Sequence, residues 1–157
     1  MANEIKDKYS AAAALTITLA SLASSTAGVG RQSTIVDNST NRYQKIKLYC
    51  QIKLGTSPSG SSGVYVFSIR GDQHATPYRT DGAGASDAAL TVLNAPLLGV
   101  MRDLASPSTG DVLYGEFELL TPGPEWGICI VHDTAVALNS TGGNHFCHWI
   151  GVDAEVQ

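Results

Sequence analysis

Alternation of apolar and polar side chains is the main structural signal along this chain. Between Gln44 and Leu54 every second residue, beginning at Ile46, is apolar, and the residues between them are mostly charged or polar. A period of two places one face of a long strand against a core. The apolar segment Val64–Arg70 follows a Gly- and Ser-rich turn at 55–63, so we expect the two segments to pair as a hairpin.

Shorter strands are predicted along the rest of the chain, separated by clusters of Gly, Pro, Asn and Ser. They are expected at Leu15–Leu19, Ser33–Val36, Ala88–Leu93, Leu97–Leu104, Val112–Leu120, Trp126–His132 and His145–Val152. About eight or nine short strands with regular turn signals favour an all-β fold, an antiparallel β-sandwich of the jelly-roll type. The core is expected to contain Ile46, Leu48, Ile52, Tyr65, Phe67, Ile128 and Ile130.

The length of 157 residues fits one domain with its own hydrophobic core. We expect residues 11–157 to form a single β-sandwich domain and residues 1–10 to form a polar N-terminal arm outside that core. No apolar stretch approaches the roughly 18 residues that span a bilayer, so no membrane partner is expected. We also expect no export signal, because the alanine-rich segment near the N-terminus is weakly hydrophobic.

Charge and composition narrow the range of partners. Charged residues make up 15% of the chain, against roughly 25% in an average soluble domain. A surface so poor in charge suits a protein that spends much of its life against other protein. The net charge is −4. The densest basic run contains Arg42, Lys45, Lys47 and Lys53, and three of these alternate along one predicted strand face. We therefore expect no nucleic-acid binding, which normally needs a basic stripe.

The chain contains three cysteines, Cys50, Cys129 and Cys147. An odd number does not indicate a disulfide framework. Cys50 and Cys129 lie in apolar strand patterns, where a free thiol behaves as a small hydrophobic side chain. Synthesis in a reducing bacterial cytoplasm fits this usage.

The sequence His145-Phe-Cys-His148 raises the question of a zinc site. Strand alternation places His145 and Cys147 on one face and His148 on the other. Two further ligands, such as His132 or Cys129, would have to come from a neighbouring strand. We therefore expect a strand with one buried face, with no metal and no other cofactor.

A catalytic centre is not evident in the sequence. No Gly-x-Ser-x-Gly nucleophile turn is present. His132 and Asp133 are adjacent and would point apart on a strand, whereas Glu116 and Glu118 share a strand face, as is common on a solvated sheet. We expect the protein not to be an enzyme and to have no catalytic residues.

Three short motifs have a simpler structural interpretation. Arg70-Gly-Asp72 is the tripeptide that integrins bind, and here it falls at the end of a predicted strand. Asn38-Ser-Thr40 and Asn139-Ser-Thr141 match the glycosylation pattern. We interpret the two glycosylation patterns as turns in which asparagine adopts a left-handed backbone.

Several segments, in this order and spacing, resemble a family of small virion proteins of tailed bacteriophages encoded near the capsid genes. The segments are Ala14–Ala23, Gly30–Ser33, Val36–Asn38, Tyr78–Ala89, Trp126–Ile128 and Gly142–His145. The resemblance covers nearly the whole chain in patches and implies a virion component. Gly30–Ser33 is expected to be a turn into the second strand, with Arg31 bridging to a carboxylate.

The leading hypothesis is a capsid decoration, or cement, protein that is made in the host cytoplasm and located in the virion. It would bind the lattice of the major capsid protein and stabilise the assembled head by mass action. Copies of the chain are also expected as partners, and a closed trimer would suit local threefold sites.

Two alternatives remain open. One is a tail, neck or fibre-associated structural protein of the virion. The other is a carbohydrate-binding module for host attachment, in which exposed aromatic rings would stack on sugars rather than pack across strands. The candidates for that role are Tyr43, Tyr49, Tyr65, Tyr78 and Tyr114.

Overall fold

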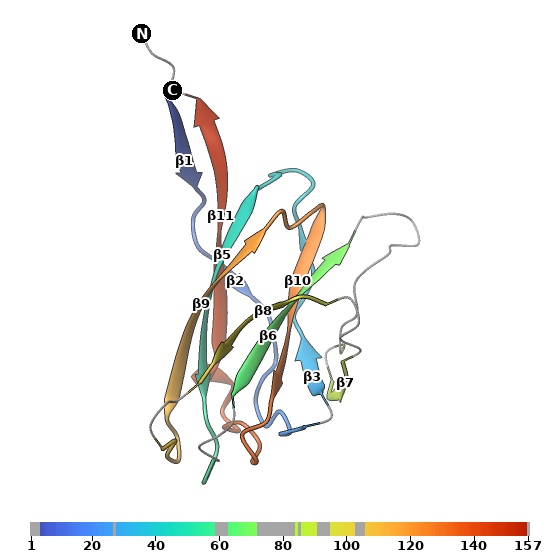
Figure 1. The fold of residues 1–157 in the computed structure, drawn as a ribbon, viewed down its shortest axis with the longest axis vertical. Helices are drawn as coiled ribbons and strands as arrows, with labels where there is room; N and C mark the ends of the chain where they lie inside the picture. Colours follow the sequence, from blue (N-terminus) through green and yellow to red (C-terminus); the bar gives the residue numbers. More distant parts are fainter. Residues whose placement is uncertain are drawn as a thin grey trace.

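The computed structural model describes residues 4–26, 28–58, 63–71, 84, 86–90, 95–102 and 106–156. These residues form eleven β-strands and a single 3-10 turn, η1 (Gly142–Asn144). The strands make two antiparallel sheets that pack face to face as a sandwich (Figure 1). The predicted all-β sandwich is confirmed. Within the described ranges, no helix is long and apolar enough to cross a bilayer.

One sheet, sheet A, has the order β1-β11-β5-β9, with β2 also paired to β11. Its strands are β1 (Ile5–Tyr9), β2 (Ala13–Leu15), β5 (Lys45–Lys53), β9 (Val112–Leu120) and β11 (Phe146–Val156). Sheet B has the order β7-β3-β10-β6-β8, with β4 paired to β10. Its strands are β3 (Val29–Gln32), β4 (Val36–Asp37), β6 (Val64–Gly71), β7 (Ala88–Ala89), β8 (Leu97–Met101) and β10 (Glu125–His132).

This connectivity is that of a jelly roll. Strands β1 and β2 run along β11 as one interrupted strand, and β3 and β4 run along β10 in the same way. We count β1 with β2 as one strand and β3 with β4 as another, and we leave out the two-residue β7, so eight strands remain. Numbered along the chain, these eight strands have the order 1-8-3-6 in sheet A and 2-7-4-5 in sheet B. That order defines the jelly roll and confirms the prediction. The two interruptions and β7 explain why eleven strands form where eight or nine were predicted.

The core lies between the two sheets. Every second residue of β5 is buried, as the alternation predicted, and these side chains meet the inward-facing residues of β6 and β10. Five of the seven predicted core residues belong to this cluster: Ile46, Leu48, Ile52, Ile128 and Ile130. Segments outside the strands complete it, because Leu19 and Leu22 are also buried there.

The predicted hairpin between the segments at 44–54 and 64–70 is wrong. Strand β5 lies in sheet A between β11 and β9, whereas β6 lies in sheet B between β10 and β8. The connection at 55–63 is long enough to cross from one sheet to the other. The apolar faces of the two strands therefore pack against each other across the core, with Val64 and Val66 in the same cluster as Ile52.

The placement of Tyr65 and Phe67 in the core is also wrong. Strand β6 turns Val64, Val66 and Ser68 inward, and Tyr65 and Phe67 lie half-buried on the outer face of sheet B. The strand is apolar on both faces, so alternation alone could not decide its orientation. Phe67 packs instead on a second apolar cluster of Ile69, Leu90, Cys129 and Val131.

Some predicted boundaries move. The strand expected at Leu15–Leu19 ends at Leu15. In place of the one expected at Ser33–Val36, β3 ends just before this range and β4 begins at its last residue. His145 precedes β11 and follows η1. Residues 91–93 and 103–104, which were expected to continue two strands, lie outside the described residues.

Residues 5–9 of the expected N-terminal arm form a strand. Strand β1 pairs with the last residues of β11, from Tyr9 opposite Val152 to Ile5 opposite Val156. All five residues of β1 are exposed, and the two strands project beyond the sandwich (Figure 1). We call β1 and residues 152–156 the ribbon.

Candidate functional site

The ribbon has two unlike faces. Residues directly opposite each other in an antiparallel pair lie on the same side. Ile5, Asp7 and Tyr9 therefore share one face with Val152 and Ala154, while Lys6 and Lys8 lie on the other. Ile5 and Tyr9 are 74% and 55% exposed, so this face is open to solvent. We call it the apolar face, because Asp7 is the one charged residue that β1 places on it.

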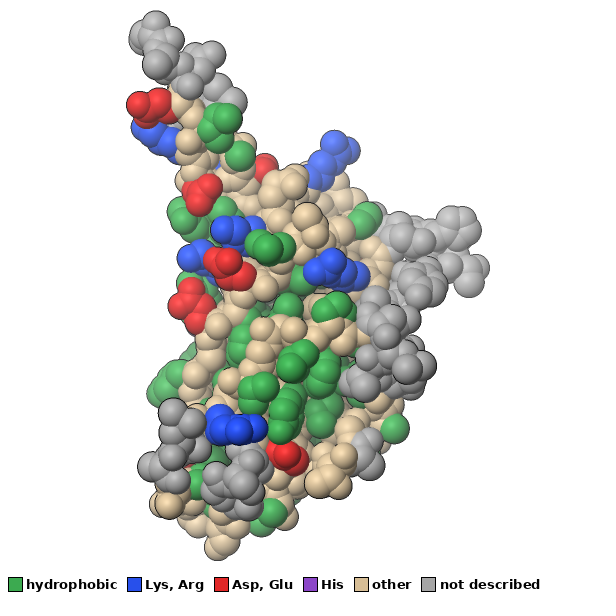
Figure 2. Space-filling model, viewed as in Figure 1, with side chains coloured by type: hydrophobic (Ala, Val, Ile, Leu, Met, Phe, Trp, Pro, Cys, Tyr) green, Lys and Arg blue, Asp and Glu red, His purple; other side chains and the backbone are tan. Residues whose placement is uncertain are grey.

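Sheet edges provide further exposed apolar surface. Strands β8 and β9 are the outer strands of their sheets among the described residues. Leu97 and Val100 on β8, and Val112 and Leu120 on β9, are exposed. Figure 2 shows apolar side chains gathered over β6 and β8 and charged ones gathered around the ribbon. Open edges with exposed apolar residues are sites where another chain can pack.

An aromatic hollow lies on the outer face of sheet A. Its volume is about 480 Å³. Strand register places His148 beside Tyr49 and Tyr49 beside Glu116, and in the next row Phe146 and Tyr114 flank Gln51. We define the aromatic hollow by Tyr49, Tyr114, Glu116, Phe146 and His148, with Cys50 and Gly115 also lining it.

Three of the rings in this hollow stack on one another in a row. The Tyr49 and His148 rings are nearly parallel, at an interplanar angle of 14° with centroids 5.1 Å apart. Phe146 and His148 are 6.1 Å apart at 25°. Tyr114 and Phe146 are 73% and 46% exposed, so their rings are available to a ligand.

The other predicted aromatic candidates are used structurally. Tyr43 packs edge-on against Trp149, with ring centroids 6.0 Å apart. The Tyr65 hydroxyl donates a hydrogen bond to Asp133 Oδ2 at 3.1 Å. Tyr78 lies outside the described residues. Of the four candidate tyrosines that the structure describes, two, Tyr49 and Tyr114, therefore stay candidates for ligand stacking.

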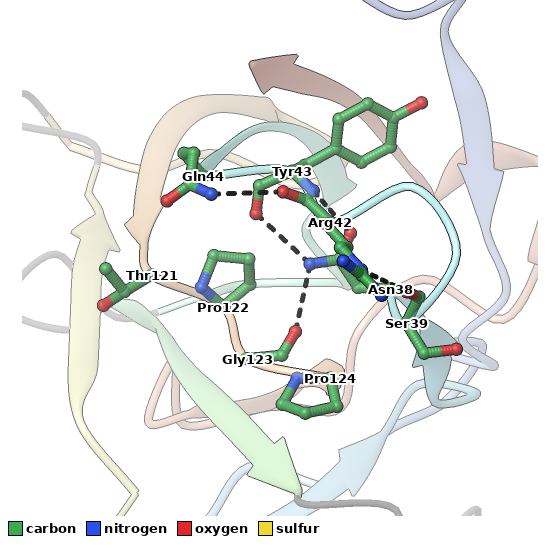
Figure 3. Close-up of a pocket in the computed structure, with 9 residues that line it drawn as sticks. All are labelled: Asn38, Ser39, Arg42, Tyr43, Gln44, Thr121, Pro122, Gly123 and Pro124. Atoms are coloured by element: carbon green, nitrogen blue, oxygen red, sulfur yellow. Dashed lines mark hydrogen bonds between the residues drawn. The ribbon is translucent and has the colours of Figure 1, made fainter. Parts of the chain in front are cut away.

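A second hollow, of about 510 Å³, lies between the turns at 38–44 and 121–124 (Figure 3). The buried Asn38 amide holds these turns together. Its Nδ2 donates to the carbonyl oxygens of Tyr43 and Gly123 at 3.2 and 3.0 Å, and its Oδ1 accepts from Tyr43 N at 3.0 Å. Because the amide is fully engaged with the backbone, this hollow is best explained as a structural joint.

The expected turns at the two glycosylation patterns are present, but their backbone differs from the prediction. In the first turn the left-handed residue is Arg42, with φ 54°, and not Asn38. Asn139 also has an ordinary φ, and its Oδ1 accepts from Thr141 N at 3.0 Å. The side-chain hydrogen bonds of asparagine stabilise both turns, and the left-handed tolerance of asparagine is not used.

Arg31 bridges to a carboxylate, as expected. Its Nε donates to Asp87, and its Nη1 donates to the carbonyl oxygens of Thr18 and Ala20 at 3.0 and 2.9 Å. The motif itself is strand β3 and not a turn. Gly30 lets β3 approach β10, because a Cβ there would lie 2.5 Å from the Ile130 carbonyl oxygen.

His145 and Cys147 are buried on the core side of β11, while Phe146 is exposed, as alternation predicted. Both nitrogens of His145 are engaged: Nε2 donates to the Asn139 carbonyl at 2.8 Å, and Nδ1 accepts from Lys53 N at 3.3 Å. Burial lowers the pKa of His145, despite the hydrogen bond to the Asn139 carbonyl. A neutral imidazole with both nitrogens occupied has no lone pair left for a metal.

His132 is enclosed in the core. Its Nε2 lies 2.8 Å from the Leu22 carbonyl oxygen, and its Nδ1 lies 2.9 Å from Thr134 Oγ1. Burial lowers the pKa of His132, against the opposing effects of the Leu22 carbonyl and of Asp133. Asp133 points away and accepts from Gly63 N at 2.6 Å. The adjacent histidine and aspartate therefore have separate structural roles.

Cys50 and Cys147 face each other across β5 and β11 with their Sγ atoms 2.8 Å apart. Both are free thiols, as is Cys129 in sheet B. The hydrogen bond with Cys147, together with burial, raises the pKa of the Cys50 thiol. A thiol held protonated in this way is a poor nucleophile.

The remaining motif residues have ordinary partners. Glu116 and Glu118 both face solvent and lie 3.9 and 3.8 Å from Lys47 Nζ and Lys45 Nζ. Arg70 Nη2 donates to the Leu120 carbonyl oxygen at 3.0 Å, and Asp72 lies outside the described residues. Within the described part of the chain, no three His, Cys, Asp or Glu side chains converge as a metal site would require.

No family model, curated protein or solved structure matches the chain.

Proposed function

We propose that this chain is a non-enzymatic structural protein of a bacteriophage virion, a decoration (cement) protein that binds the assembled head. Its partners are the lattice of the major capsid protein and other copies of the chain. The observation that supports this most directly is the ribbon, which extends beyond the sandwich and exposes Ile5 and Tyr9. The other support is the sequence resemblance to small virion proteins.

The physical argument starts from the marginal stability of an isolated two-stranded ribbon in water. An apolar ribbon face is favourable when it packs on a second surface. Burying one side chain of the size of Ile5 or Tyr9 contributes about 1.5–3 kcal/mol. A composite surface that forms only after capsid assembly would give the protein affinity for the head and none for free subunits.

The test separates the two faces of the ribbon. The variant Ile5→Asp/Tyr9→Ala removes the apolar face, and Lys6→Ala/Lys8→Ala is the matched control on the opposite face. The apolar-face variant is expected to bind mature heads roughly tenfold or more weakly than the parent, and the control variant about threefold or less. The melting temperature of each variant is expected to stay nearly unchanged. Deletion of residues 1–10 is likewise expected to reduce binding more than folding.

Heads lacking the protein are expected to assemble but to release DNA at a lower temperature. Equal binding by the apolar-face variant and the control would contradict the role of the ribbon. Finding the protein only in tail fractions would contradict the head assignment and favour the tail, neck or fibre alternative. Absence from virions would refute the proposal as a whole.

A further inference from the structure

The outer face of sheet A carries a chemistry that head binding does not require. Its aromatic hollow combines three nearly parallel rings, those of Tyr49, His148 and Phe146, with the exposed ring of Tyr114 and the carboxylate of Glu116. We propose that the aromatic hollow is a saccharide-binding site. This inference goes beyond the proposed function and does not depend on it.

The ring arrangement selects the ligand class. Aromatic rings present flat, weakly negative faces that suit the polarised C–H groups on one side of a pyranose. A quaternary ammonium group would be held best by rings that enclose it from several directions. Here the Phe146, His148 and Tyr49 rings stack on one another in a row at interplanar angles of 25° and 14°, so they line an open hollow and do not enclose a cation. The exposed rings of Phe146 and Tyr114 are the ones left to contact a sugar.

Polar groups at the edge of the aromatic hollow suit sugar hydroxyls. Glu116 lies opposite Tyr49 on the neighbouring strand, and its Oε1 is 3.9 Å from Lys47 Nζ. At that distance the carboxylate keeps lone pairs available to accept from a ligand. The hydroxyl of Tyr114, a donor and an acceptor, lies at the outer strand β9. Apolar contact with a few placed polar groups is the usual composition of a small-molecule site.

Strand pairing makes the aromatic hollow rigid. Its residues come from three adjacent strands, β11, β5 and β9, which pair over their whole shared length. The floor is formed at Cys50 and Gly115, whose inward sides pack in the core. A rigid site loses little conformational entropy when an extended saccharide binds.

The experiment titrates the full chain with maltohexaose, chitohexaose, a delipidated bacterial lipopolysaccharide and choline chloride, and follows amide resonances by NMR. At least one saccharide is expected to bind in the millimolar range or tighter and to shift resonances of β5, β9 and β11. Tyr114→Ala and Phe146→Ala are each expected to weaken that binding roughly tenfold or more. Tyr9→Ala, an exposed tyrosine on the ribbon, is the matched control and is expected to bind as the parent does.

Both test positions are exposed, so the variants are expected to fold, and circular dichroism checks this. The proposal is overturned if none of the saccharides binds, or if they bind equally well to Tyr114→Ala and Phe146→Ala. Binding of choline without any saccharide would also overturn it and indicate a cation site. If the Ile5→Asp/Tyr9→Ala variant lost head binding but still bound saccharide, the saccharide site would be supported independently of the decoration role.

Discussion

Replacing Arg31 by alanine tests a charged side chain that holds several segments of the chain together. The guanidinium group joins three segments: β3, which carries it, the connection at 16–23, and Asp87. That connection places Leu19 and Leu22 in the core between the sheets. Loss of the guanidinium group therefore weakens the attachment of two core side chains as well as an ion pair.

The magnitude follows from the separate contacts. Hydrogen bonds from a charged donor contribute about 1.5–3 kcal/mol each, and Arg31 makes two to backbone carbonyl oxygens. Thr18 is exposed, so water can replace part of that contribution, and a partly exposed ion pair adds at most about 1 kcal/mol. The side chain of Arg31 is 14% exposed. We expect Arg31→Ala to lower the free energy of unfolding by about 2–3 kcal/mol, or the melting temperature by about 5–10 °C.

The assay is urea unfolding followed by circular dichroism, with thermal melts alongside. Arg31→Lys keeps the charge but loses the planar fork, so its stability is expected to lie between that of Arg31→Ala and that of the parent. Lys8→Ala removes an exposed ion pair with Glu155 and is the matched control, expected to cost less than about 1 kcal/mol. If Arg31→Ala were no less stable than Lys8→Ala, the idea that this arginine fastens the connection would be refuted.

Further predictions concern pH and thiols. His132 and His145 have folded-state pKa values below 6.5, so the unfolded chain binds more protons and stability should fall as pH drops below about 6.5. Urea midpoints between pH 8 and 5 test this, and a flat profile would contradict it; His145→Gln should reduce the slope. The buried thiols should not react with an aromatic disulfide reagent in the native protein, and all three should react after anaerobic unfolding. Only one reactive thiol after unfolding would mean that Cys50 and Cys147 are joined.

The sequence predicted those elements whose burial is one-sided. Strands β5 and β9 carry a clear alternation because one face meets the core and the other meets solvent, and their predicted ends agree with the structure to within a residue. Strand β10 was located for a different reason. It is buried on both faces, so its continuous apolar run marked it without any alternation.

The misses have a common physical origin in long-range pairing. Strand β1 has a polar sequence with no buried face, and it forms because the end of β11 offers it a partner. The partner of β6 depended on which sheet its connection reached, and the local pattern carries no such information. Tyr49 and Tyr114 were identified as candidates, but their neighbours Phe146 and His148 come from a strand far along the chain. Only the register of sheet A brings these four rings together.

Strand β11 also connects the two proposed surfaces, and this allows them to be tested against each other. Alternation places Phe146, His148, Ile150, Val152 and Ala154 on one side of the strand, so the aromatic hollow and the apolar face of the ribbon lie at opposite ends of one stripe. A single neighbour covering the whole stripe would also cover the lysine–glutamate pairs between β5 and β9 and would have to desolvate them. That cost favours two separate contacts about 25 Å apart along the strand. We therefore expect Phe146→Ala to bind mature heads as the parent does, and the Ile5→Asp/Tyr9→Ala variant to bind saccharide as the parent does. If Phe146→Ala lost head binding instead, the stripe would be one protein interface, and the saccharide site would have to be abandoned.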